Sequence, residues 1–174
     1  MRLFITTIIF LLISCGASTN VKAQTKTVSQ NINTPFVGTW EWENGNQIFR
    51  IQLFLDEDGD IGGHYSLLQT NSNGIPTVIY KSNKDIGHGL TYGSVIYGSS
   101  NGTLLKAGID DNTINNPNYT HISGSLTMEI INTGNCIGCS PTATWKIKEK
   151  KDLRLETDDR TFNIPTDIIL TKVH

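Results

Sequence analysis

The chain has 174 residues, of which 37% are hydrophobic and 17% are charged, and its formal net charge is -2 at pH 7. A chain of this length can build one hydrophobic core without a metal, and 3 cysteines are too few for a disulfide-built scaffold. The glycines show no three-residue period and the aliphatic residues no heptad, which excludes collagen and coiled coil. The weak acidity argues against nucleic acid as a partner, because such a surface needs clustered basic residues.

The beginning of the chain predicts export. The apolar run over residues 3–13 has the length of a signal-peptide core and is too short to span about 30 Å of hydrocarbon. Residues 1–23 are therefore expected to be a signal peptide cleaved after Ala23, which delivers the protein to the periplasm or the cell exterior. Alternatively, residues 12–15 form a bacterial lipobox, and the signal ends before Cys15. In that case Cys15 carries lipid, the protein is an outer-membrane lipoprotein, and this lipid is its only expected membrane contact.

A polar stretch separates the signal from the folded body. Residues 24–35 contain no aromatic side chain and no periodic apolar pattern, so they are expected to be a flexible leader. Residues 36–174 contain no internal repeat or linker and are expected to form a single β domain.

The first strands of the body show a period of two. Residues 40–43 place two tryptophans on one face and two glutamates on the other, which is typical of a strand between core and water. Asn44 and Gly45 favour a tight hairpin turn, and alternation resumes over residues 47–55. This segment predicts a β-hairpin.

Further short strands and turns follow at the spacing of a β-sandwich or barrel. The other strands are expected at residues 60–69, 77–80, 94–97, 119–131, 143–148, 153–157 and 168–173. Residues 84–93 and 110–118 are weakly patterned and are expected to be loops, with one short helical turn within 109–118. No segment carries a helical apolar stripe, so the fold class is all-β, an antiparallel meander of roughly eight to ten strands.

Residues 36–40, Phe-Val-Gly-Thr-Trp, contain a Gly-x-Trp motif at Gly38 and Trp40. The motif resembles the N-terminal signature of the lipocalin or calycin barrels. This resemblance implies that the meander closes into a lipocalin-like β-barrel, in which Trp40 packs beneath the first strand and closes one end. A later arginine often covers this tryptophan in that family, and Arg154 and Lys172 are the candidates here.

A second resemblance covers most of residues 36–173. Gly-Thr-Trp, the later Gly-Gly-His-Tyr and the closing Ile-Ile-Leu-Thr-Lys follow an export signal that ends in Ala-Gln. This arrangement is similar to a group of uncharacterised small exported proteins from flavobacteria. It implies no activity.

Cys136 and Cys139 form a Cys-x-x-Cys motif. A redox motif needs a βαβ setting, and a structural zinc site needs four ligands, whereas the flanking sequence is β-type and no second cysteine pair exists. Cys15 leaves with the signal or carries lipid, so the exported body keeps an even pair in an oxidising compartment. We therefore expect a local disulfide, with free thiols and metal or redox chemistry as the alternatives.

The acidic turn at residues 56–60 carries aspartates at the first three odd positions of a calcium loop. Ile61 stands where an EF-hand needs glycine, which excludes that motif. A solvated turn is the expected state, and a looser calcium site is the alternative.

The four histidines have no short metal-ligand spacing, and no metal or other cofactor is expected. They are His64, His88, His121 and His174. His64 and His121 lie in expected strands, where half-buried residues are common, whereas His88 lies between two glycines and is the candidate for an exposed loop histidine.

No catalytic set is assembled in the sequence. The chain lacks the Gly-x-Ser-x-Gly of a nucleophile elbow. Glu41 and Glu43 share a strand face beside two tryptophans, a pattern that could serve a glycosidase, but a solvated strand face explains it more simply. The protein is therefore not expected to be an enzyme.

The leading functional expectation is an exported non-catalytic barrel that binds a small apolar or amphiphilic ligand, with ligand-binding residues that the sequence does not identify. The alternative is a cell-envelope interaction protein with a filled core, no ligand and no catalysis. An apolar cavity above roughly 300 Å³ would favour the first. A core filled by Trp40, Phe49, Leu53 and Trp145 would favour the second.

Overall fold

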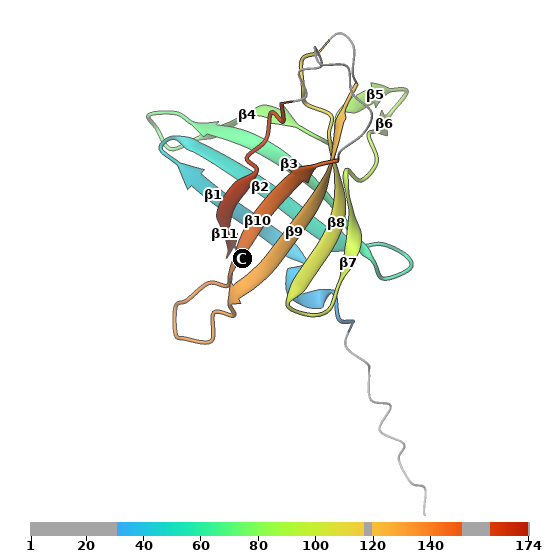
Figure 1. Ribbon diagram of the computed structural model, residues 1–174. Coiled ribbons are helices and arrows are strands. Elements are labelled where there is room, and N and C mark those ends of the chain that lie inside the picture. The colour runs from blue at the N-terminus through green and yellow to red at the C-terminus, as the bar shows by residue number, and fades with distance from the viewer. Residues whose placement is uncertain (1–30, 117–119, 151–160, 174) are drawn as a thin grey trace, which may run out of the picture.

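The computed structural model describes residues 31–116, 120–150 and 161–173, and within them the protein is built from antiparallel strands (Figure 1). One 3-10 helix, η1 (Thr34–Phe36), precedes the strands. The strands are β1 (Gly38–Asn44), β2 (Gln47–Leu55), β3 (Ile61–Thr70), β4 (Pro76–Lys81), β5 (Asp85–Gly87), β6 (Leu90–Thr91), β7 (Ile96–Ser100), β8 (Leu104–Asp111), β9 (Ile122–Asn132), β10 (Thr142–Glu149) and β11 (Asp167–Val173).

Eight of these strands close into a barrel, which confirms the predicted fold class. The sheet order is β2-β1-β11-β10-β9-β8-β7-β3-β4, and the additional pairing of β2 with β3 closes the ring. Strand β4 stays outside the ring and pairs with β3. Strands β5 and β6 form a separate small hairpin. Closure gives each barrel strand two hydrogen-bonded neighbours, so the ring itself has no exposed edge.

The predicted first hairpin is present as β1 and β2. Asn44 pairs with Gln47, and Gly45 adopts φ +62°, the left-handed conformation that this two-residue turn requires. Trp40 lies opposite Ile51, and Trp42 lies opposite Phe49. These four side chains share one face because directly opposed residues of an antiparallel pair point to the same side.

Strand β8 is the main element that the sequence pattern did not predict. Its inward positions include Leu105 and Ile109, both fully buried, but a lysine, a glycine and two aspartates interrupt its aliphatic alternation. The helical turn expected within residues 109–118 is wrong, because β8 runs to Asp111 and residues 112–116 contain no helix. The strand expected at 153–157 lies outside the described residues.

Residues 84–93 are largely exposed, as expected of a loop. The expectation that they lack regular structure is wrong, because they contain the β5–β6 hairpin. His88 and Gly89 form its two-residue turn with φ +54° and +73°. Histidine tolerates this left-handed conformation better than a β-branched residue does. The histidine therefore lies at an exposed hairpin tip.

The segment before β1 seals one end of the barrel. Asn33 is 3% exposed and donates from Nδ2 to the Gly59 carbonyl oxygen at 2.7 Å, while its Oδ1 accepts a 2.6 Å hydrogen bond from the Ser100 N–H. The expectation of a flexible leader over residues 24–35 is therefore wrong for 31–35. There, amide side chains form hydrogen bonds with backbone groups of neighbouring turns, and these bonds hold the segment in place although it buries little apolar area. Residues 24–30 and the expected signal at 1–23 lie outside the described residues.

Large side chains fill the barrel between its ends. Phe49 contacts Tyr65 and Trp145 with ring centroids 5.9 and 6.0 Å apart. The other fully buried side chains of this core include Trp40, Ile51, Ile96, Leu105, Ile109, Met128 and Leu170. Packing of this kind is what a solid protein interior shows.

The two ends of the barrel differ in construction. The closed end consists of η1, the turns at 56–60 and 101–103, and the loop at 133–141, whereas residues 82–95, 112–116 and 161–166 form what we call the mouth end. In Figure 1 the closed end is at the bottom and the mouth end at the top. The described residues contain no helix of the length and apolarity needed to span a membrane.

Candidate binding site at the mouth of the barrel

A buried carboxyl group organises the mouth end. Asp111 is the last residue of β8 and is 0% exposed. Its Oδ1 accepts hydrogen bonds from the Tyr65 hydroxyl at 2.8 Å, the Thr113 N–H at 3.0 Å and the Thr113 hydroxyl at 2.7 Å. Its Oδ2 accepts one from the Asn163 N–H at 2.6 Å. The Asp111 carboxyl group thus connects three parts of the chain through hydrogen bonds: β3, the segment after β8 and the segment before β11.

Asn112 extends this network to the chain that follows β4. Its Nδ2 donates to the Ser82 carbonyl oxygen at 2.8 Å, and its N–H donates to the Tyr65 hydroxyl at 3.2 Å. The Ser82 hydroxyl oxygen accepts from the Tyr65 N–H at 3.0 Å, and the Lys84 ammonium donates to the Asn112 carbonyl oxygen. Buried polar groups need hydrogen-bond partners, and these bonds hold the segment after β4 and the segment after β8 against β3.

Two tyrosines of this network are held in the neutral form. Burial, together with the negative charge of Asp111, raises the pKa of Tyr65 far above its ordinary value. Burial and the same charge raise the pKa of Tyr80 to about 12, and its hydroxyl donates to the Asn163 carbonyl oxygen at 3.0 Å. Both hydroxyls therefore act as hydrogen-bond donors at neutral pH and are poorly suited to give up a proton in catalysis.

Beside this network the mouth end contains a hollow of about 300 Å³. It is lined by Thr113, Ile114, Asn115, Asn116, Ile122, Thr161, Phe162 and Asn163. The lining comes from the segment after β8, the start of β9 and the segment before β11, so no single stretch of sequence defines it. The polar groups of these described lining residues are hydroxyls and amides, and none of them is ionisable. We call it the mouth hollow.

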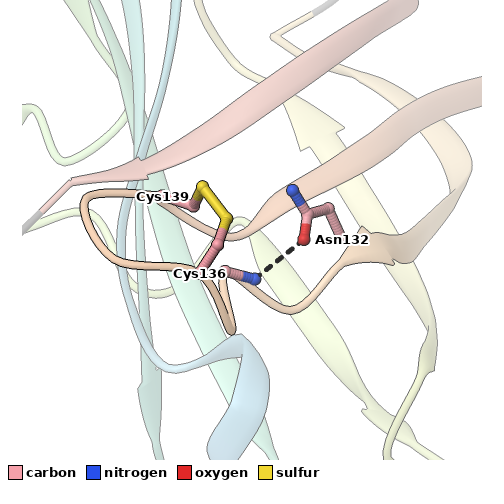
Figure 2. The surroundings of a disulfide bond; sticks show 4 residues. Asn132, Cys136 and Cys139 are labelled. Atoms are coloured by element: carbon pink, nitrogen blue, oxygen red, sulfur yellow. Dashed lines mark hydrogen bonds between the residues drawn. A yellow bond between two sulfur atoms is a disulfide. The ribbon is translucent and has the colours of Figure 1, made fainter.

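The predicted cysteine pair lies at the opposite end of the barrel. Cys136 and Cys139 form a disulfide with a Cα–Cα distance of 5.2 Å in the loop between β9 and β10, which confirms this prediction. Figure 2 shows the disulfide beside Asn132, whose Oδ1 accepts a hydrogen bond from the Gly134 N–H at 2.9 Å. Ile137, between the cysteines, is exposed, so the bridge shapes a surface loop.

Alkylation of unfolded, unreduced protein from an oxidising compartment is expected to find no free thiol at Cys136 or Cys139. Because the closed loop is so short, its stabilisation should fall below the roughly 3 kcal/mol of a 15-residue loop, and replacing both cysteines by serine should leave the fold intact. Peptide mass spectrometry after alkylation measures the first result, and a urea melt of the double variant measures the second. Two alkylated cysteines would contradict the pairing.

Gly38 and Trp40 lie together at the closed end. Trp40 is fully buried, and its Nε1 donates to the Phe36 carbonyl oxygen at 2.8 Å. The Lys172 ammonium lies 5.4 Å from the Trp40 ring centroid and donates to the Pro35 carbonyl oxygen at 2.9 Å. Gly38 has φ +125°, and a Cβ there would lie 3.1 Å from Lys172 Cε. The glycine therefore allows the lysine stem to pass, and burial lowers the lysine pKa. The other candidate, Arg154, lies outside the described residues.

Glu41 and Glu43 differ in their surroundings, although they share a strand face. The Glu41 side chain is 12% exposed, and its Oε1 pairs with Arg50 Nε at 2.5 Å. The expectation of a fully solvated face is therefore wrong at Glu41, because the arginine on the neighbouring strand covers it. Glu43 is exposed as expected.

The three described histidines lie in different parts of the fold. His64 Nδ1 lies 3.3 Å from the Ser82 hydroxyl, and burial lowers its pKa. His88 lies at the hairpin tip and His121 is exposed, whereas His174 lies outside the described residues. In the acidic turn, Asp56 Oδ1 accepts hydrogen bonds from the N–H groups of Asp58 and Asp60. No group of three or more histidine, cysteine or acidic side chains that could hold a metal ion occurs in the described part of the chain.

The fold and the mouth hollow define a class: a closed eight-stranded antiparallel β-barrel with a packed interior and a polar depression at one end. The chain belongs to a family of unknown function, DUF6705, which it matches over residues 1–173. No curated protein and no solved structure matches the chain significantly.

Proposed function

We propose that the protein is an exported, non-catalytic interaction barrel that contacts its partner through the mouth end and does not enclose an apolar ligand. The filled interior is the observation that carries this proposal. Trp40, Phe49 and Trp145 are fully buried and Leu53 is 3% exposed. Burial of these four side chains distinguishes a filled core from a barrel that holds a ligand in its interior.

The closed end supports a calycin-like architecture without requiring an interior ligand. The Lys172 ammonium lies over the Trp40 ring, where the family that the Gly-x-Trp motif resembles often has an arginine. A cation over an aromatic face stabilises the fold by about 0.5–2 kcal/mol, depending on its desolvation. This structural role accounts for the motif.

The hydrogen bonding at the mouth supports a binding role more than a catalytic one. Both oxygens of Asp111 are already engaged by donors of the protein itself. Tyr65 and Tyr80 remain neutral because their pKa values are raised. Such groups position the surrounding chain, whereas a general acid or base needs a pKa near the working pH.

The position of the N-terminal segment supports recognition at the mouth. Asn31 contacts Gly59 at the closed end, where its Nδ2 donates to the carbonyl oxygen at 3.0 Å. A chain that reaches the barrel there, whether from a cleaved terminus or from a lipid on Cys15, joins it at the end opposite the mouth. The mouth end also bears the exposed aliphatic residues Ile86 and Leu90 on the β5–β6 hairpin. Exposed apolar side chains beside a polar depression are typical of contact surfaces.

Titration of the purified protein with an apolar fluorescent fatty acid tests the filled-core proposal. We expect no stoichiometric binding and no quenching of tryptophan fluorescence, because Trp40, Phe49 and Trp145 are all fully buried within one core cluster. Mass spectrometry of an organic extract of the natively purified protein is expected to find no carried lipid. A lipid bound at one equivalent, with quenching of Trp40 or Trp145, would overturn the proposal in favour of an apolar-ligand carrier.

The export proposal has its own test, the intact mass of the full chain after expression in a Gram-negative host. Cleavage after Ala23 would give a protein beginning at Gln24, and lipidation would give a heavier species beginning at Cys15. Either mass in the envelope or extracellular fraction supports export. An uncleaved protein confined to the cytoplasm would contradict it.

A further inference from the structure

We infer that the mouth hollow binds a neutral sugar residue. The inference rests on the proposed function and specifies what the mouth recognises. At about 300 Å³ the hollow lies at the lower end of the roughly 300–1,000 Å³ of small-molecule sites, which suits a single ring better than an extended chain. It also lies at a barrel mouth, one of the places where ligand sites concentrate.

The lining indicates an uncharged ligand rich in hydroxyl groups. Five of its eight residues are threonine or asparagine, and the other three are Ile114, Ile122 and Phe162. Hydroxyl and amide side chains both donate and accept hydrogen bonds, as the hydroxyls of a sugar do. A charged ligand would lose its hydration here without meeting an opposite charge among the described lining residues, which is costly. An anion would in addition approach the carboxyl group of Asp111.

The polar wall of the hollow is held in place before any ligand arrives. Asp111 fixes Thr113 through its N–H and its hydroxyl, and fixes Asn163 through its N–H. The Asn163 amide nitrogen in turn lies 3.3 Å from both the carbonyl and the hydroxyl oxygen of Thr113. Two segments distant in sequence are thus locked side by side. Such preorganisation reduces the entropy lost on binding.

Polar atoms remain available on this wall. The Oδ1 of Asn163 accepts no hydrogen bond from any described residue, and the Asn115 side chain is exposed with no hydrogen-bond partner among them. Together they offer an acceptor from one segment and an amide from another. A sugar that bridges them would engage adjacent hydroxyl groups.

Phe162 supplies the apolar surface that a sugar ring also needs. Its ring is half-buried, and it occupies the space above Gly124, where an added Cβ would lie 2.8 Å from Phe162 Cζ. Because residue 124 is a glycine, the Phe162 ring can pack against the barrel core beside the hollow. The C–H groups on one face of a pyranose pack well against an aromatic ring, while its hydroxyls point to the polar wall.

Titration of the full mature chain with glucose, galactose, mannose and N-acetylglucosamine, followed by amide NMR, tests the inference. At least one of these sugars is expected to shift the signals of Thr113, Asn115 and Asn163. Glucuronic acid and glucosamine, which carry charge, are expected to bind at least about tenfold more weakly. A parallel titration with a neutral polysaccharide separates a free sugar from the end of a glycan, since a glycan site should bind the polymer more tightly than the monomer.

Substitutions in the hollow are expected to weaken this binding by about tenfold or more. Asn163→Ala removes the free acceptor but keeps the backbone N–H that contacts Asp111, and Phe162→Leu removes the ring but keeps an apolar side chain. Asn46→Ala and Phe54→Leu are matched controls at exposed positions outside the hollow and should bind like the unaltered protein.

Absence of any shift at the hollow with every sugar and the polysaccharide would overturn the inference, as would equal loss of binding in the controls. The filled-core proposal would survive either result, because it fails only if an apolar ligand occupies the interior. Preferential binding of the charged sugars would also overturn the inference.

Discussion

Trp40→Ala is expected to lower the free energy of unfolding by about 3–5 kcal/mol, the range for removal of a large buried aromatic side chain. The ring is fully buried, donates a hydrogen bond to the Phe36 carbonyl oxygen and lies beneath the Lys172 ammonium. All three contacts end with the substitution. Since a domain is stable by only about 5–15 kcal/mol, the variant should be close to unfolding. Urea melts followed by circular dichroism measure the change.

The control for this prediction is Glu43→Ala rather than a substitution of Glu41. Glu43 is exposed on the same strand, and its replacement should change stability by no more than about 0.5 kcal/mol. Glu41 is unsuitable because its side chain is largely covered and pairs with Arg50. If Trp40→Ala were as mild as Glu43→Ala, the closed end would not depend on the tryptophan, and the calycin-like interpretation would lose its support.

Asp111→Ala is the second substitution with a large expected effect, a loss of about 3–5 kcal/mol, because it removes the acceptor that several buried donors share. It leaves the Tyr65 hydroxyl and the N–H groups of Thr113 and Asn163 without their acceptor. Each buried donor left unsatisfied costs about 1–3 kcal/mol before the chain relaxes. Thermal and urea melts measure the loss, and NMR should show the largest changes in residues 112–116 and 161–164.

Asp58→Ala is the matched control for this variant. Asp58 lies in the solvated turn at the closed end, and its side chain accepts no hydrogen bond from the described residues, so its removal should be nearly neutral. Asp111→Asn is a milder probe: it keeps the shape of the side chain and one carbonyl oxygen, but its NH₂ group would face a donor. It should destabilise less than alanine. Equal stability of Asp111→Ala and Asp58→Ala would mean that the network does not hold the mouth together.

At the mouth end, the sequence pattern predicts only part of the candidate site. The sequence predicts a loop rich in asparagine and aspartate at residues 110–118, and four lining residues of the hollow come from this stretch. The sequence gives no sign that Asp111 is buried, because an aspartate before asparagine is typical of solvated turns. Asn163 offered no local signal at all, since its contact with Asp111 joins positions 52 residues apart.

The amino-acid sequence by itself determined the local structure of this protein. Alternation of apolar and polar residues, with Asn-Gly at the turn, defined the β1–β2 hairpin and the all-β class. The even count of cysteines that remains beyond the expected signal, and their short spacing, pointed to the Cys136–Cys139 disulfide. These features depend on interactions between neighbours in the chain, so a short window of sequence contains their cause.

The tertiary structure alone decided which strands close the ring, how the interior is filled and what lies at each end. Strand β8 has weak alternation of its own and is held by β7 and β9 on either side. Residues 31–35 are polar enough to predict a flexible leader, yet they are fixed because turns from distant strands offer them backbone partners. The burial of Asp111 and the assembly of the mouth hollow likewise follow from closure of the barrel, which brings together groups whose sequence separation hides their contact.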